Sequence, residues 1–257
     1  MKITTLIENL SYKRGLLAEH GLSLYLETGS SKILFDTGQS GAFMDNAKKL
    51  GISIEDIDSV VISHGHYDHT GGLSSFLMVN SKAKVYIKKE ALTEKYDAAK
   101  RKIGITFDPL ILQGRVEFIT DIKEIDSGIF IIPDIPILNK TDTSFGTFND
   151  EFPDELYLAV ILNGELSVIT GCSHRGITNI IESAVNHFNL PVNLVLGGFH
   201  TMNHTPGQFE TVLDYFRQNA PKSIGACHCT GIERYADLLH KCNTKVFYNS
   251  TGSIVEI

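Results

Sequence analysis

The feature that most constrains this chain is a dense group of polar side chains directly after an apolar run. Residues 59–63 read Ser-Val-Val-Ile-Ser, which is typical of a strand buried on both faces. The segment His64-Gly65-His66-Tyr67-Asp68-His69 follows at once. In an extended strand exit, residues two apart point the same way, so His64 and His66 can converge on one metal ion. The turn and helix start beyond them can direct Asp68 and His69 at a second ion.

The donor types indicate which metals fit. Imidazole and carboxylate ligands suit Zn²⁺, Fe or Mn. The chain has only four cysteines among 257 residues, which favours an open catalytic site over a closed, thiolate-rich structural one. We therefore expect two divalent metal ions as cofactors, with zinc as the first choice and iron or manganese as the alternatives.

Three later histidines also end apolar runs beside glycine or cysteine. They are His174 in Thr170-Gly171-Cys172-Ser173-His174, His200 in Gly197-Gly198-Phe199-His200, and His228 in Ala226-Cys227-His228-Cys229. In α/β proteins, sites are built at the C-terminal ends of strands. We expect these three to ligate metal or transfer protons. The remaining histidines lack this placement and are predicted to be structural or surface residues: His20, His187, His204 and His240.

Strand and helix patterns alternate along most of the chain. Hairpins are expected at 23–28 with 32–36, and at 156–162 with 165–170, where Asn163-Gly164 is a strong hairpin turn. The other expected strands are 2–8, 59–63, 84–88, 129–132, 192–196, 223–226 and 245–248. The expected helices are 40–50, a short one after Gly71-Gly72, one from near Glu90, 177–189, 206–219 and 232–241.

One hairpin and several buried strands occur in each half of the chain. This arrangement predicts an α/β fold, in which two sheets pack face to face with helices outside, as a four-layer αββα sandwich. Residues 96–150 are less regular, and we interpret them as an insertion or active-site cover. No linker or low-complexity run interrupts residues 1–257, so a single domain is expected.

Charge and composition indicate which classes of binding partner to expect. The net charge is −7 with acids and bases mixed, whereas a nucleic-acid surface normally shows a basic stripe. No stretch approaches the ~18 apolar residues of a membrane helix, and Glu8 and Asn9 interrupt any signal-peptide core. The four cysteines show no disulfide spacing. We expect a cytoplasmic protein with a small-molecule substrate and no nucleic-acid or membrane partner; a homo-oligomer stays open.

Several residues near these motifs have weaker signals. Asp36, after a buried strand, is expected to hydrogen-bond the histidine loop rather than bind metal. Gly38-Gln39-Ser40-Gly41 precedes a helix and is either a phosphate cradle or a simple N-cap turn. Tyr67 could line the rim of the pocket, and Cys227 and Cys229 are expected to pack in the core. Three phenylalanines of the irregular stretch are expected either to form part of an aromatic wall of the pocket or simply to anchor the loop: Phe145, Phe148 and Phe152.

These motifs resemble a known family. Ser63-His64-Gly65-His66-Tyr67-Asp68-His69 matches the His-x-His-x-Asp-His signature of the metallo-β-lactamase superfamily, and Phe35-Asp36-Thr37-Gly38 matches the strand end that precedes it there. The strand ends that carry His174, His200 and His228 narrow the resemblance to dihydropterin-ribofuranosylaminobenzene 5′-phosphate synthase-like proteins. The resemblance covers nearly the whole chain.

The resemblance implies a ligand set. His64, His66 and His174 would hold one metal, and Asp68, His69 and His228 the other. Many members have an aspartate that bridges the two metals, but here Cys172 follows Thr170-Gly171. The bridge is therefore open between Cys172, His200, an upstream acid such as Asp154, and a hydroxide alone.

The function expected from this resemblance is a metal-dependent hydrolase. A metal-activated water would attack a phosphoester or a phosphorylated, pterin-like small molecule, with Asp68 orienting the nucleophile and His200 protonating the leaving group. One alternative is a transferase that condenses a dihydropterin diphosphate with an aryl amine. The other is a non-catalytic pterin-binding protein with a structural metal.

Overall fold

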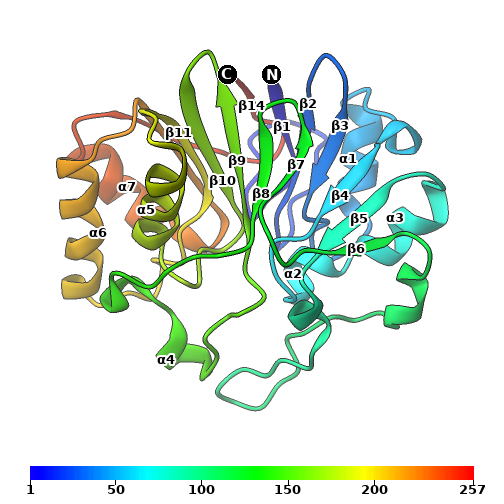
Figure 1. Ribbon diagram of the computed structural model, residues 1–257, viewed down its shortest axis with the longest axis horizontal. Coiled ribbons are helices and arrows are strands. Elements are labelled where there is room, and N and C mark those ends of the chain that lie inside the picture. The colour runs from blue at the N-terminus through cyan, green and yellow to red at the C-terminus, as the bar shows by residue number, and fades with distance from the viewer. The chain divides into compact units, whose positions relative to one another are not determined.

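The computed structural model describes residues 1–257, which divide into two compact units. One unit comprises Met1–Thr120 with Ser250–Ile257, and the other comprises Asp121–Asn249. Each unit contains one seven-stranded mixed sheet with its own helices (Figure 1). None of the helices is long and apolar enough to cross a bilayer.

The sheet of the first unit has the strand order β14-β1-β2-β3-β4-β5-β6. Pairing is antiparallel from β14 to β3 and parallel from β3 to β6. The strands span Lys2–Ile7 (β1), Ser23–Glu27 (β2), Lys32–Phe35 (β3), Ser59–Val61 (β4), Lys84–Ile87 (β5), Val116–Phe118 (β6) and Ile254–Glu256 (β14).

Three α-helices belong to this unit. They are α1 (Ala42–Lys49), α3 (Leu73–Val79) and the four-residue α2 (Tyr67–Thr70), with single 3₁₀ turns at Ile54–Asp56, Lys89–Leu92 and Pro109–Leu112. Phe43 of α1 and Phe76 of α3 are fully buried in a cluster that includes Leu34 and Val60 of the sheet. Burial of such side chains is the main force that holds helices on a sheet, at about 25 cal/mol per Å² of apolar area.

The sheet of the second unit has the order β13-β12-β11-β10-β9-β8-β7. Here β10 to β13 are parallel and β7 to β10 antiparallel, so both sheets combine a parallel half with an antiparallel half. The strands span Lys123–Asp126 (β7), Ile129–Ile132 (β8), Tyr157–Leu162 (β9), Glu165–Thr170 (β10), Val192–Gly198 (β11), Ser223–Cys227 (β12) and Lys245–Tyr248 (β13).

Two apolar clusters fix the helices of this unit. One joins Val195 and Ile224 of the sheet to Phe209, Phe216 and Leu238 on the helices. The other packs helix residues Ile180 and Ala184 against strand residues such as Tyr157 and Val168. The helices are α4 (Phe145–Phe148), α5 (Ile177–Phe188), α6 (Pro206–Gln218) and α7 (Ile232–Lys241), with 3₁₀ turns at Lys140–Asp142 and His228–Thr230.

Most predicted elements are confirmed to within a residue or two, and the differences concern short, edge or irregular segments. The helix expected from Glu90 is wrong, because only the 3₁₀ turn Lys89–Leu92 forms there. The irregular stretch 96–150 supplies β6, β7 and β8, which lie at the outer parts of the two sheets. The edge strands β6, β7 and β14 were not predicted, because each has only three or four residues and none of these residues is buried.

Glycine at position 197 is required by the close approach of two strands. Gly197 of β11 has φ +141°, and a Cβ there would lie 2.1 Å from the carbonyl oxygen of Thr170 on β10. We expect Gly197→Ala to lower the free energy of unfolding by roughly 2–4 kcal/mol, because backbone must move to relieve the clash.

The matched control is Gly207→Ala on α6, where no atom lies within 4 Å of the added Cβ. Alanine there should be neutral or stabilising by about 0.5–1 kcal/mol. Urea unfolding of the two variants checks the expectation, and equal stabilities would contradict it.

Candidate metal centre

The histidine motif leaves β4 and enters α2 with its ligand-type side chains buried. His64 and His69 are fully buried, and His66 and Asp68 are 5% and 6% exposed. The His64 ring lies 4.6 Å from that of His66 and 4.3 Å from that of His69, centroid to centroid. Burial, and then the neighbouring imidazoles, lower the pKa of His64 well below its ordinary value. The neutral imidazole, which is the form that binds metals, is therefore favoured.

Asp36 anchors this motif from the end of β3. Its Oδ1 accepts the backbone N–H of Ser63 at 2.7 Å, and its Oδ2 accepts the Ser63 hydroxyl at 2.7 Å. The same Oδ2 lies 2.6 Å from Nδ1 of His69. Because a carboxylate accepts hydrogen bonds, Nδ1 of His69 carries the proton and Nε2 is the nitrogen left to bind a metal.

A serine orients His64 in the same way. The Ser63 hydroxyl donates its single hydrogen to Asp36, so its oxygen can only accept from Nδ1 of His64, 3.0 Å away. Thr37 also holds the motif, since its backbone N–H and its hydroxyl both donate to the carbonyl of His69, at 2.8 and 2.9 Å.

His174 in the second unit has an equivalent support. The Ser144 hydroxyl donates to the carbonyl of His174 at 3.2 Å and accepts from Nδ1 of His174 at 2.8 Å. The buried carboxylate of Glu155 accepts the backbone N–H groups of His174 and Arg175, each at 2.7 Å. Burial raises the pKa of Glu155 to about 7. Phe152 stacks on the His174 ring at 3.9 Å with an interplanar angle of 3°.

The strand ends of the second unit bring His200 close to His174 and Gly198 close to His228. The His200 ring centroid lies 4.4 Å from that of His174, and the His200 backbone N–H donates to Sγ of Cys229. A Cβ on Gly198 would lie 2.6 Å from that sulfur and 3.3 Å from Cδ2 of His228, so only glycine fits there.

Four of these strand-end residues have left-handed backbone. The φ angles are 60° at Asp36, 59° at Ser173, 50° at His200 and 52° at His228. Non-glycine residues adopt this conformation rarely, and such strain tends to occur at functional sites. The strain at each strand end is therefore independent support for a site at these positions.

The candidate residues divide between the units. In the first unit, Asp36, His64, His66, Asp68 and His69 lie together, and Tyr67 lies among them on α2. In the second unit, Cys172, His174, His200 and His228 follow β10, β11 and β12, and Cys172 and Asp154 are buried.

Sequence reasoning missed four supporting residues. They are His20, whose Nε2 lies 3.2 Å from Oδ2 of Asp68, together with Ser63, Ser144 and Glu155. The position of Ser63 directly before the motif was an available signal. His20 gave none, because its contact depends on how the irregular segment between β1 and β2 folds back.

Two minor predictions change. The hypothesis that Gly38–Gly41 binds a phosphate is wrong. Oε1 of Glu19 already accepts the backbone N–H groups of Gln39 and Ser40 at 3.0 Å each, so these two groups are not available to a phosphate. Cys229 is buried, as expected, but it lies in a 3₁₀ turn and its sulfur accepts a hydrogen bond from His200. Among the aromatic residues, Phe148 and Phe152 do contact His174, while Phe145 lies against the Arg175 guanidinium.

The metallo-beta-lactamase superfamily model matches residues 17–176, which include the histidine motif and His174. The chain belongs to the metallo-β-lactamase superfamily. A crystal structure described as a metal-dependent hydrolase of the β-lactamase superfamily is 34% identical, with a TM-score of 0.87 over 100% of this chain and 99% of that one. The predicted metallo-β-lactamase fold is thereby confirmed. Members of this superfamily normally bind divalent metals.

Two relatives come from Methanocaldococcus jannaschii. An uncharacterised protein is 32% identical over 99% of this chain and 100% of its own length. A 7,8-dihydropterin-6-methyl-4-(β-D-ribofuranosyl)-aminobenzene-5′-phosphate synthase is 28% identical over 91% of this chain and 88% of its own length. The resemblance inferred from the strand-end motifs is confirmed by this second relative.

The Asp36 carboxylate predicts how metal affinity responds to mutation. Asp36→Asn removes the negative charge of the side chain and exchanges one of its two acceptor oxygens for an NH₂ group. Loss of such a partner of a ligating histidine costs about 10- to 100-fold in metal affinity. Chelator competition with zinc should show this drop. Asp56→Asn, at an exposed carboxylate in the same unit, is the control and should leave affinity unchanged. Equal affinities in both variants would contradict the role of Asp36.

Proposed function

We propose that this protein is a metal-dependent hydrolase acting on a phosphoester or a phosphorylated, pterin-like small molecule. Superfamily membership supports metal-dependent catalysis, and the hydrolase of similar structure supports hydrolysis. The name of the synthase relative supports a substrate of pterin type. We place the protein in the cytoplasm, without a nucleic-acid or membrane partner; its oligomeric state stays open.

The observation that carries this proposal is the common tautomer of three histidines, in which Nδ1 carries the hydrogen and Nε2 is left to bind a metal. His64, His69 and His174 each have Nδ1 hydrogen-bonded to an oxygen, from Ser63, Asp36 and Ser144 respectively. Histidines that ligate metals almost always donate the other ring N–H in this way. Structural histidines in a core need no such common orientation, so the donor set fits divalent metals.

The ligands divide into two sets. His64, His66 and His174 would hold one metal, and Asp68, His69 and His228 would hold the other. Imidazole with carboxylate and few thiolates favours zinc, with iron or manganese as alternatives. Cys172 stands where many members have a bridging aspartate, so the candidates for a bridge remain Cys172, His200, Asp154 and hydroxide alone.

The bound metals would supply a water whose pKa is lowered toward about 7, and would neutralise the charge that develops on the phosphoryl oxygens. The side chains of this chain would do the rest. Asp68 orients the attacking water, and His20, 3.2 Å from its Oδ2, holds that carboxylate in place. His200 gives a proton to the leaving-group oxygen as its bond to phosphorus breaks.

Aromatic side chains would shelter the reaction from bulk water. Phe152 covers one face of His174, and the Phe148 ring lies 5.2 Å from that of His174 and 5.5 Å from that of His200. A low-dielectric wall of this kind strengthens every charge interaction within the site.

A second candidate function is favoured by the name of one relative. The synthase of M. jannaschii suggests that this chain could condense a dihydropterin diphosphate with an aryl amine. Mass spectrometry of products formed with and without an amine acceptor separates the two. Hydrolysis gives inorganic phosphate and the same dephosphorylated pterin in both mixtures, whereas condensation gives a C–C or C–N linked adduct together with free diphosphate, and only when acceptor is present.

His66→Ala tests the hydrolase proposal. Loss of a ligand should lower kcat/KM for bis(p-nitrophenyl) phosphate on the order of 10³-fold while the circular dichroism spectrum is retained. His240→Ala, on the exposed face of α7, is the control and should leave turnover within about twofold. Unchanged turnover in folded His66→Ala protein would refute the assignment.

A further inference from the structure

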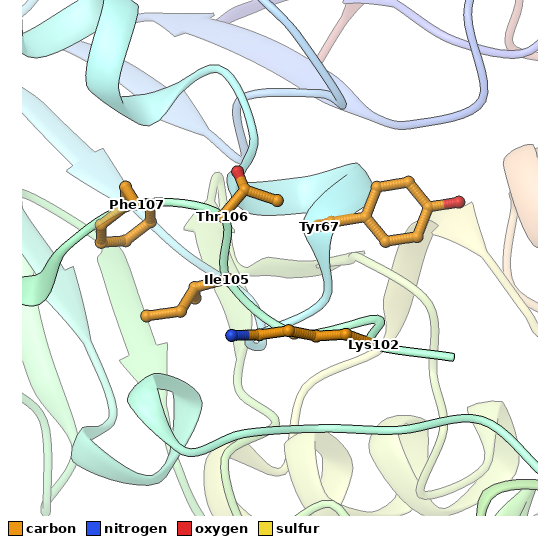
Figure 2. A pocket seen from close by; sticks show the side chains of 6 residues that line it. Tyr67, Lys102, Ile105, Thr106 and Phe107 are labelled. Carbon is orange, nitrogen blue, oxygen red and sulfur yellow. The ribbon is translucent and has the colours of Figure 1, made fainter. Parts of the chain in front are cut away.

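A cavity of about 440 Å³ lies beside the histidine motif, within the first unit. That volume is in the range of small-molecule sites. Figure 2 shows Tyr67, on α2, on one side and the segment from Lys102 to Phe107 on the other. The lining residues are Tyr67, Lys102, Gly104, Ile105, Thr106 and Phe107.

Backbone hydrogen bonds hold the two walls of this cavity together. The N–H of Tyr67 donates to the carbonyl of Ile103 at 2.9 Å, and the N–H of Ile103 donates to the carbonyl of Lys95 at 2.9 Å. Tyr96 and Lys102 form an antiparallel bridge across the same hairpin. These bonds fix the position of the cavity relative to the histidine motif. One of its walls is Tyr67, which stands between His66 and Asp68 in the sequence.

The walls suit a flat, apolar group. Tyr67 and Phe107 contribute aromatic rings, and Ile105 is 7% exposed and contributes an apolar surface. Phe107 also packs against the core of the first unit, so its position is supported from behind. Aromatic and aliphatic walls with few polar groups are the usual lining of sites for ring-containing ligands.

One charged side chain lines the cavity, and its charge is positive. Lys102 pairs with Glu94 at 3.4 Å, but the two side chains are 53% and 67% exposed. An exposed pair of this kind contributes little, so the ammonium can exchange Glu94 for a ligand anion. Residues 88–102 contain six basic and three acidic residues, a net +3 in a chain of net −7. The local field therefore favours an anion.

We infer that this cavity binds the aromatic ring and the anionic group of the substrate, with Tyr67 and Phe107 around the ring and Lys102 on the negative charge. The inference rests on the proposed function, which it deepens by naming an arene that carries a phosphate-like dianion. Lys102 would be a specificity determinant, since it selects charged over neutral arenes.

Isothermal titration calorimetry with phenylphosphonate tests this inference. The compound has both the ring and the anion, and its carbon–phosphorus bond is not a phosphoester, so a phosphoester hydrolase does not consume it during the titration. Lys102→Met keeps the length of the side chain and removes its charge. This change should weaken phenylphosphonate binding about tenfold. Binding of benzyl alcohol, which has the ring without the anion, should change less than twofold. The titrations use the protein as purified and are repeated after chelation, so that binding to metal is separated from binding to the cavity.

The matched control is Lys89→Met, an exposed lysine of the same basic segment that does not line the cavity. It should leave both affinities unchanged. Equal effects of the two substitutions on phenylphosphonate, or an equal loss of benzyl alcohol binding in Lys102→Met, would overturn the inference.

Turnover of p-nitrophenyl phosphate separates this inference from the proposed function. Lys102→Met should raise KM about tenfold with kcat nearly constant. If no phosphoester is hydrolysed but the pattern of affinities holds, the hydrolase proposal fails and the cavity assignment stands. If turnover is present and Lys102→Met changes neither KM nor affinity, the cavity assignment fails alone.

Discussion

The candidate site of the first unit depends on one buried carboxylate. Asp36 is fully buried, and a lone carboxylate there would cost several kcal/mol in lost hydration. Its hydrogen bonds with the N–H and hydroxyl of Ser63 and with Nδ1 of His69 compensate that cost. The same bonds fix the strand exit at Ser63 and the helix at His69, which are the two ends of the histidine motif. One side chain thus sets the positions of four ligand candidates.

The mixed sheets explain why these residues follow the strands that they do. In each sheet, the parallel strands end at a common edge, and their C-terminal residues gather there. Asp36 and His64 follow β3 and β4, and His174, His200 and His228 follow β10, β11 and β12. Left-handed backbone at Asp36, His200 and His228 turns the chain sharply as it leaves each strand. That strain is stabilised by the packed strands behind it.

Much of this fold could be predicted from sequence because its strands are apolar and its turns distinctive. The Asn163-Gly164 hairpin and the apolar run before His64 are local signals, so they can be recognised from the sequence without knowledge of tertiary contacts. The edge strands β6 and β14 were missed because they are stabilised by pairing with a neighbour rather than by their own pattern. The 3₁₀ turn at Lys89–Leu92 lacks the length that helix periodicity requires.

The site was predictable where ligands cluster in sequence and obscure where they are supported from a distance. His20 reaches Asp68 across 48 positions, and Ser144 reaches His174 across 30. Glu19 fills the Gln39–Ser40 turn in a way that no local motif shows. Contacts of this kind depend on how loops pack, so only the structure shows them.

Metal analysis of protein purified without added metal tests whether the histidine motif and the strand-end histidines hold metal ions. We expect about two divalent transition-metal ions per chain, with zinc the most abundant, and a clear loss of metal in the double variant His64→Ala with His66→Ala. Native-like protein that retains no metal, with turnover of a phosphoester unaffected by chelator, would contradict this expectation.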